Sequence, residues 1–230
     1  MARTASALIA TVCNICRCPG FTVEAGQFLN DILDDLCQHK DLKVNRVTSS
    51  FTLQAGSNGP TNLEADYLRT YDMFYYVGGD PFFLNPSNTR QFDADADQNV
   101  GTGYPFEYNT DLSAVASGGV GLLYVFDAPS SATTITHRYM TRRASIVSPE
   151  ASQTIPWMTD QTYLIAELSA RLMMLTDDER QPGMKQQAED QLRQHLIMEG
   201  DEQAVVRRVE LDWRTFRTGN GVRKTKTSPY

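Results

Sequence analysis

The chain has 230 residues, of which 41% are hydrophobic and 21% charged, and its formal net charge is −7 at pH 7. This length and composition allow a sizeable hydrophobic core and exclude an intrinsically disordered protein. No stretch approaches the roughly 20 consecutive apolar residues that cross a bilayer, so we expect a soluble protein without a membrane partner.

Basic residues are concentrated at the C-terminal end. Between Trp213 and Tyr230 there are five basic residues and no acidic one, which leaves 16 basic against 28 acidic residues in the rest of the chain. Proteins that bind nucleic-acid backbones need a basic face that releases counterions. The acidic body therefore excludes broad nucleic-acid binding as the main function.

The N-terminal segment predicts two helices. Residues 4–17 and 23–39 both have apolar side chains at helical spacing, and a Pro-Gly step at Pro19 separates them. Thr22 is the expected N-cap of the second helix, because its hydroxyl can accept a hydrogen bond from a free backbone N–H.

The middle of the chain has the composition of β-strands. Residues 44–53 alternate between apolar and polar side chains, and residues 71–77 run into a turn cluster at 78–81 that suits a hairpin. Residues 120–126 carry apolar side chains on both faces, which predicts either a strand buried on both faces or a strand at the centre of a sheet. The turn that follows, together with the alternation at 134–140, predicts a second hairpin.

Helical spacing returns after Pro156, with Thr159 and Asp160 as candidate caps. Four aliphatic residues at spacings of three and four are expected on the buried face of this helix: Ile165, Leu168, Leu172 and Leu175. A polar break at 177–183 precedes a further helix, over 184–199, marked by Ala188, Leu192 and Leu196.

These elements predict an α+β fold in which N- and C-terminal helices form a small helical bundle, with a β-sheet insertion and an extended C-terminal arm. The expected parts are 1–42 and 151–210 for the helical domain, 43–150 for the β-rich insertion and 211–230 for the arm.

The four cysteines all lie in the first 37 residues: Cys13, Cys16, Cys18 and Cys37. Four thiolates can close a tetrahedron around zinc, but here three of them crowd one helix end and the fourth lies on another helix. We therefore predict small buried cysteines in helix interfaces, and no metal.

A second candidate cation site is the run in which Asp93, Asp95 and Asp97 alternate, as at the start of a calcium loop. Gln98 stands where the loop needs glycine, and Tyr104 where it needs a closing glutamate. A solvated acidic loop is the preferred interpretation.

No pair of base and nucleophile marks a catalytic site. His39, His137 and His195 have no matching serine or cysteine motif, and the glycine-rich stretches lack the context of a phosphate loop. His137 lies in an alternating strand and is interpreted as a packing residue or a surface ring. We predict that the protein is not an enzyme and uses no cofactor.

The C-terminal segment combines cations with aromatic side chains, which are residue types enriched at protein interfaces. It is also too polar and too rich in glycine to form a core of its own. We therefore predict a docking arm, with these candidate contact residues: Trp213, Arg214, Phe216, Arg217, Arg223, Lys224, Lys226, Pro229 and Tyr230.

The order of these parts resembles that of the head-to-tail adaptor, or tail accessory, proteins of short-tailed bacteriophages. Particular stretches carry the resemblance: Ala65–Arg69, Leu122–Pro129, Ile155–Met158, Trp213–Phe216 and Lys224–Lys226. The cysteine-rich start and the acidic loop have no counterpart in that family.

The resemblance implies a structural virion protein, assembled in the host cytoplasm, that joins the portal protein to a tail or nozzle protein. It further implies a homo-oligomeric ring of twelve copies through which DNA passes without sequence-specific binding. The C-terminal arm would lie along the portal, the two C-terminal helices would pack around the ring, and the insertion would face the tail.

The expected tail-facing or inter-subunit surface comprises aromatic and acidic residues of the insertion: Tyr75, Tyr76, Phe82, Phe83, Asp93, Asp95 and Asp97. The alternative is a carbohydrate- or receptor-binding module, in which aromatic residues of the sheet, including Tyr104 and Phe106, would stack on sugars. A small hydrolase is a remote third hypothesis, because the base and nucleophile are missing.

Overall fold

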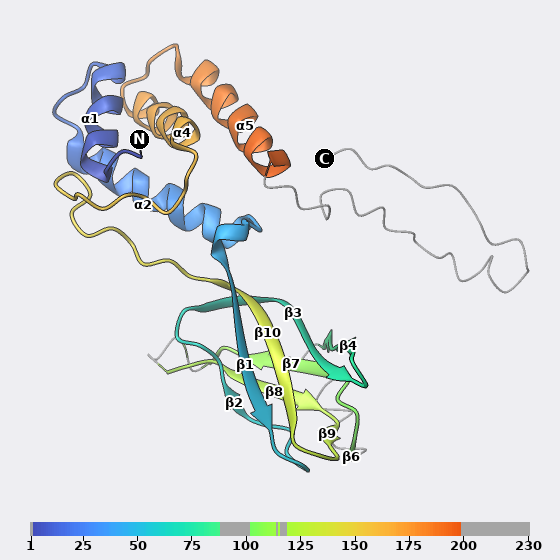
Figure 1. Cartoon of the computed structure of the whole chain (residues 1–230). Helices are drawn as coiled ribbons and strands as arrows, with labels where there is room; N and C mark the ends of the chain where they lie inside the picture. Colours follow the sequence, from blue (N-terminus) through green and yellow to red (C-terminus); the bar gives the residue numbers. More distant parts are fainter. Residues whose placement is uncertain (1, 88–101, 114, 116–118, 199–230) are drawn as a thin grey trace, which may run out of the picture.

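A computed structural model describes residues 2–87, 102–113, 115 and 119–198. Within these residues, four α-helices gather in one lobe, and two four-stranded β-sheets form a second lobe (Figure 1). The chain starts in the helical lobe, enters the β lobe and returns to the helices. The expected α+β fold, with strands inserted between helices, is confirmed.

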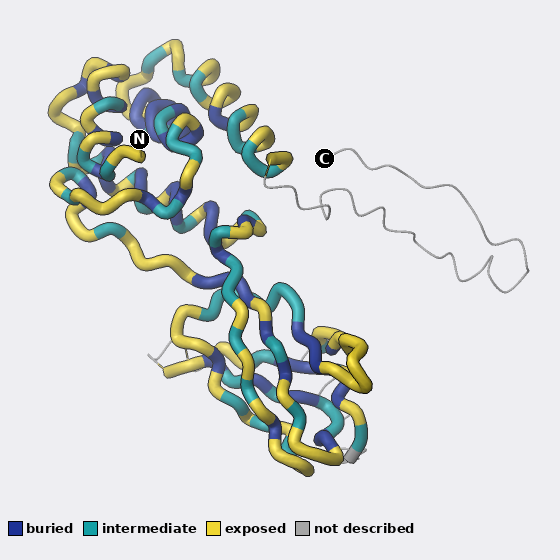
Figure 2. Tube along the Cα trace, viewed as in Figure 1, coloured by how far each residue is buried: buried dark blue, intermediate teal, exposed yellow. Residues whose placement is uncertain are grey.

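The helical lobe consists of α1 (Ala5–Cys16), α2 (Thr22–His39), α4 (Gln161–Leu175) and α5 (Gln181–Met198). α4 contacts each of the other three helices, so the N- and C-terminal helices pack together as expected. Figure 2 shows α4 as the most deeply buried of them. Its apolar residues pack with those of α1 and α2 in one core, which includes Leu8, Leu29, Ile32, Leu164 and Leu168.

The helix ends agree in part with the sequence. Asp160 caps α4, because its carboxylate accepts a hydrogen bond of 3.0 Å from the backbone N–H of Thr162. The N-cap predicted for α2 is wrong: Thr22 is already its first helical residue, and Phe21 occupies the capping position without a side-chain bond. Leu175, expected in the core, is half exposed because α4 ends there.

α5 begins earlier than the expected residue 184, with Pro182 in its first turn, where a missing N–H costs no hydrogen bond. Ala188 is the buried residue of α5, while Leu192 and Leu196 are partly buried against the helical core. Most of α5 is exposed or intermediate (Figure 2). This helix is therefore the least embedded of the four.

The first sheet of the β lobe has the strand order β1-β10-β3-β4, and the second has the order β2-β8-β7-β5. The strands of the first sheet are β1 (Arg46–Leu53), β3 (Tyr67–Val77), β4 (Asp80–Phe83) and β10 (Thr133–Thr141). Those of the second are β2 (Thr61–Asn62), β5 (Asn85–Pro86), β7 (Glu107–Asp111) and β8 (Leu122–Phe126). Two short strands, β6 (Thr102–Gly103) and β9 (Ala128–Pro129), form a parallel pair, and a 3-10 turn, η1 (Lys43–Asn45), leads into β1.

The two sheets face each other across a core of their own, separate from that of the helices (Figure 1). The first sheet contributes Met73 and Ile135 among others, and the second contributes Tyr108, Leu123 and Val125. The molecule thus has two hydrophobic cores.

One of the two expected hairpins is confirmed. β3 and β4 pair antiparallel, and the turn between them is made by Gly78 and Gly79, whose φ angles are 61° and 102°. Positive φ at both central residues is the requirement of a tight hairpin turn, and glycine meets it without strain.

The second expected hairpin is wrong, because β8 and β10 belong to different sheets. The chain between them does not turn back. It forms β9, which pairs with β6, and then crosses to the first sheet. Of the two interpretations of residues 120–126, the strand at the centre of a sheet is confirmed, because β8 lies between β2 and β7. Burial of both faces is not found: Leu123 and Val125 are buried, whereas Leu122, Tyr124 and Phe126 are intermediate.

Candidate interaction surfaces

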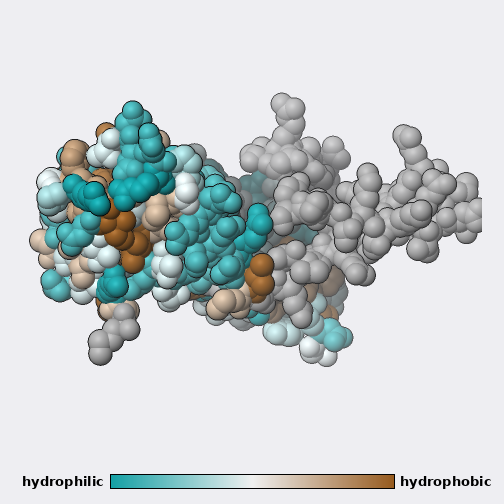
Figure 3. Space-filling view, turned by 90° about the horizontal axis from the view of Figure 1, so that it is seen from above, coloured by the Kyte–Doolittle hydropathy of each residue, from teal (hydrophilic) through white to brown (hydrophobic). Residues whose placement is uncertain are grey.

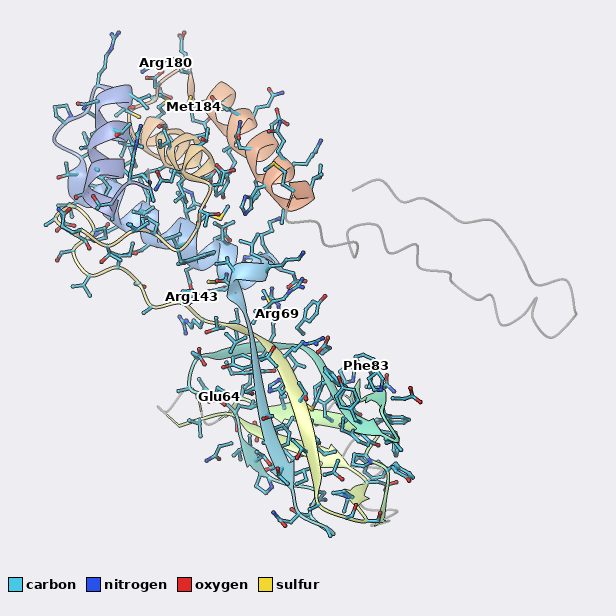
Figure 4. All side chains as sticks on the ribbon, viewed as in Figure 1. Glu64, Arg69, Phe83, Arg143, Arg180 and Met184 are labelled. Atoms are coloured by element: carbon cyan, nitrogen blue, oxygen red, sulfur yellow. The ribbon has the colours of Figure 1, made fainter. Side chains whose placement is uncertain are left out.

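The β3–β4 hairpin carries a group of exposed apolar side chains, which we call the hairpin surface: Tyr76, Val77, Phe82 and Phe83. Tyr76 is 63% exposed and Phe83 52% exposed. Figure 4 shows Phe83 on β4, in the lobe away from the helices. A cluster of exposed aromatic side chains is typical of a surface that another molecule covers.

Two rings of the hairpin surface, those of Tyr76 and Phe83, pack on the buried Phe74, whereas the ring of Phe82 packs on Tyr75 at 5.4 Å. Phe83 and Phe74 have ring centroids 5.3 Å apart, and Tyr76 meets Phe74 edge-on at 5.7 Å. The guanidinium of Arg138 lies 4.8 Å from the centre of the Phe74 ring and is paired with Asp72 at 3.2 Å. A rigid aromatic group beside an arginine has the composition of an interface hot spot.

Tyr75, expected on this surface, lies in the core of the β lobe. Its hydroxyl donates a 2.9 Å hydrogen bond to the carbonyl of Pro105, and burial raises the pKa of the phenol. The reason is the period of the strand: Tyr75 points inward between Phe74 and Tyr76, which point outward.

The other expected contact residues lie outside the described residues. This holds for Asp93, Asp95 and Asp97, and for the whole arm: Trp213, Arg214, Phe216, Arg217, Arg223, Lys224, Lys226, Pro229 and Tyr230.

The junction between the lobes is held by Arg69, which extends from β3 to the C-terminal end of α2 (Figure 4). Its guanidinium donates to the carbonyls of Gln38, Cys37 and Lys40 at 2.6, 3.3 and 3.3 Å, and to the carboxylate of Asp41 at 2.7 Å. The last carbonyls of a helix have no intrahelical hydrogen-bond partner and carry a partial negative charge. A guanidinium supplies both the missing donors and a compensating positive charge.

A second set of contacts lies on the other side of β1, where Figure 4 shows Arg143. Arg143 donates to the carbonyl of Val44 at 2.6 Å and to the side chain of Asn45 at 3.2 Å. The side-chain amide of Asn30 on α2 also exchanges two hydrogen bonds with the backbone of Ile146. Polar contacts on both sides of β1 thus fix the β lobe relative to the helices.

Replacing Arg69 with alanine is expected to lower the free energy of unfolding by about 1–2 kcal/mol and to loosen the junction, because the carbonyls at the end of α2 lose a charged donor. Urea unfolding measures the first effect, and hydrogen exchange of the amides of residues 38–45 the second. Arg138→Ala is the matched control, since the ion pair of Arg138 lies within one lobe. Equal exchange in both variants would contradict this role.

In the sequence, the stretch Ala65–Arg69 contributed to the family resemblance, but no contact was predicted for Arg69. Asp66, three residues earlier, accepts hydrogen bonds from the hydroxyls of Tyr139 and Thr141, and its carbonyl accepts one from the backbone N–H of Arg142. The available signal was an acidic and a basic residue at the start of a strand, a pattern too common to indicate such contacts.

α4 and α5 are joined by an ionic group around Glu167, whose side chain is only 4% exposed. Lys185 of α5 lies 2.9 Å from its carboxylate, and Arg171 of α4 lies 3.1 Å from the same oxygen. Arg171 is also 3.7 Å from Asp35 of α2. Two cations compensate the burial of one carboxylate, and the group connects three helices.

Replacing Lys185 with methionine is expected to destabilise α5 by about 1–2 kcal/mol, because Glu167 keeps one of its two cations while the aliphatic stem is preserved. Hydrogen exchange along α5 provides the measurement. Arg193→Met removes an exposed cation from the same helix and serves as the control. If the two variants exchange alike, the ionic group does not hold α5.

The four cysteines are buried free thiols. Cys16 donates to the carbonyl of Ser169, whereas the sulfur of Cys37 accepts from the amide of Asn45. Burial raises the pKa values of Cys13, Cys16 and Cys37, that of Cys16 to about 11. Among the described residues, no group of three or more histidine, cysteine or acidic side chains is arranged to hold a metal ion.

His137, interpreted as a packing residue or a surface ring, is a packing residue: it is 2% exposed. Its Nε2 atom lies 3.1 Å from the hydroxyl of Thr70, and its ring is in tilted contact with those of Tyr67 and Tyr139. The other two histidines lie near carboxylates of the helical lobe, His39 beside Asp35 and His195 3.9 Å from Asp160.

The outer surface of the helical lobe is mainly polar. Viewed from the helical end, Figure 3 shows a small group of hydrophobic atoms among hydrophilic ones. Exposed hydrophobic residues of this lobe include Ile15, Phe21, Val23, Met174 and Leu175. In the described part of the chain, no helix combines the length and the apolar character that crossing a bilayer requires.

Among curated proteins, none matches this chain. The family model of the SU10 adaptor protein matches residues 3–219, which include both lobes and the start of the C-terminal segment. The match extends over nearly the whole sequence and agrees with the resemblance noted from the sequence. The chain therefore belongs to the SU10 adaptor protein family, a family of structural head-to-tail adaptors of phages.

Proposed function

We propose that copies of this chain form a ring, twelve by the family resemblance, that joins the portal to the tail in the virion and surrounds the path of the DNA. The observation that carries the proposal is the family match over residues 3–219. The acidic composition of the body supports it, because a channel wall with few cations lets DNA slide without adhering.

In this proposal the four parts of the chain have separate tasks. The helices within 1–42 and 151–210 pack around the ring, and the insertion, 43–150, faces the tail or nozzle protein. The arm, 211–230, docks on the portal. The arm's aromatic residues and five cations support this assignment, as does the exposure of the hairpin surface at the opposite lobe.

Deleting residues 213–230 tests the docking arm. The truncated protein is expected to lose attachment to isolated portal rings of the same phage, because the deletion removes the aromatic anchors and all five cations. Co-sedimentation with portal rings measures attachment. Unchanged attachment by the truncated protein would rule out the arm as the portal contact.

A matched variant separates the two ends of the adaptor. Phe83→Ser removes an exposed ring of the hairpin surface and is expected to weaken joining of the tail protein while portal attachment stays normal. Imaging of the assembled complex gives the copy number. A count other than twelve would contradict the ring size, and loss of portal attachment in Phe83→Ser would contradict the division of tasks.

A further inference from the structure

A shallow groove of about 470 Å³ lies in the β lobe, where the end of β3, the segment after β6 and the turn before β10 meet. Its lining includes two tyrosines and a series of hydroxyl side chains: Tyr76, Tyr104, Ser130, Ser131, Thr133 and Thr136. The volume is within the range of about 300–1,000 Å³ typical of small-molecule sites. The hydroxyl side was not predicted from the sequence.

The two tyrosines present exposed rings on a braced frame. Tyr76 is 63% and Tyr104 65% exposed, yet Tyr76 rests edge-on against Phe74. Tyr104 precedes Pro105, whose carbonyl accepts the hydrogen bond from the buried Tyr75 hydroxyl. These contacts hold the ring of Tyr76 and the backbone next to Tyr104, which lowers the conformational freedom lost when a ligand stacks there.

The hydroxyl side of the groove is braced as well. The backbone N–H of Ser130 donates to the carbonyl of Gly103 at 3.2 Å, which ties the turn to β6. The hydroxyl of Thr133 donates to the carbonyl of Ser131 at 2.9 Å. The Thr133 hydroxyl, whose proton is used in this bond, can still accept, and the serine hydroxyls can donate or accept, so this side suits a ligand that offers both functions.

The absence of charged side chains among the described lining residues limits the class of ligand further. Among the described residues that line the groove there is no aspartate, glutamate, lysine, arginine or histidine, although the chain as a whole carries a net charge of −7. Phosphate and carboxylate groups bind most strongly to cationic side chains, and basic peptides to carboxylates. The groove therefore suits an uncharged ligand.

We propose that this groove binds a neutral oligosaccharide, one sugar ring stacking on Tyr104 and its hydroxyl groups bonding to the serine and threonine side. The activity is separate from that of the adaptor and does not rest on it. A proline-rich peptide also stacks in aromatic grooves, but its prolines supply carbonyl acceptors and no N–H, so it matches the hydroxyl side less well.

The test uses the full-length protein and two defined probes, maltotetraose and tetra-N-acetylchitotetraose. Saturation-transfer NMR is expected to show transfer to at least one probe, with affinity about millimolar as befits a shallow site. Tyr104→Ala is expected to weaken binding about tenfold, the change that loss of one stacked ring can produce. Phe83→Ala removes an exposed ring that does not line the groove, and should leave binding unchanged.

Three outcomes would overturn the proposal: no transfer to either probe, equal binding by the Tyr104→Ala variant, or binding of a proline-rich peptide in place of both sugars. Tyr104 is exposed, so its replacement should leave the fold intact, and circular dichroism verifies this. Portal attachment, measured on the same variants, keeps failure of the sugar site distinct from failure of the adaptor function.

Discussion

Replacing Leu123 with alanine is expected to lower the free energy of unfolding of the β lobe by about 2–5 kcal/mol. Leu123 is fully buried in β8, where it is paired with Thr61 of β2 on one side and Thr110 of β7 on the other. The missing atoms leave a cavity between the two sheets. Because hydrogen bonds hold the strands of each sheet in place, the sheets cannot close on this cavity. Urea unfolding followed by tyrosine fluorescence measures the loss.

The neighbouring residue provides the control. Leu122→Ala removes the same atoms from the opposite face of β8, which is partly exposed, so it should cost clearly less. Because the two lobes have separate cores, helical circular dichroism should persist in Leu123→Ala under conditions that unfold the sheets. Simultaneous loss of both signals would show that the lobes unfold as one unit.

The second prediction with a large effect concerns the free energy of unfolding at low pH. Burial lowers the pKa of His137 to about 4, against 6.5 when the side chain is exposed in the unfolded chain. Between these values the unfolded state binds a proton that the folded state does not, so stability rises with pH. The contribution is therefore complete above pH 6.5 and is lost as the pH falls toward 4, by about 3 kcal/mol in total.

His137→Gln makes this contribution measurable, because glutamine can still bond to Thr70 but does not titrate in this range. As the pH falls from 7 to 4, the unfolding free energy of the parent protein should fall by more than that of the variant. His39→Gln, which changes an exposed histidine of the helical lobe, serves as the control variant. If the variant does not fold, NMR titration of the His137 ring tests the lowered pKa directly.

The sequence predicted the elements whose pattern is local. Apolar spacing located α1, α2 and α4 to within a residue or two, and Gly78-Gly79 identified the β3–β4 hairpin because its backbone geometry nearly requires glycine. The family could also be recognised from the sequence, since the order of parts and several short stretches carried the resemblance. These signals lie within a few residues of one another along the chain.

The rest depended on distant contacts. Nothing in residues 120–140 shows that β9 pairs with β6 and takes the chain to the other sheet. The position of Arg69 at the end of α2 joins residues about 30 apart, and the ionic group at Glu167 becomes visible only when α5 lies on α4. The hydroxyl side of the groove likewise follows from the way the β9–β10 turn meets β3 and β6.

The β lobe is joined to the helices by two strands that are direct neighbours, β1 entering and β10 leaving, with Arg46 opposite Met140. Antiparallel partners lie about 5 Å apart, so removal of everything beyond this pair would leave two ends that a very short linker could reconnect. Different distal lobes could therefore be grafted onto one helical base. The β lobe could thus be exchanged in evolution while the packing of the four helices stays unchanged.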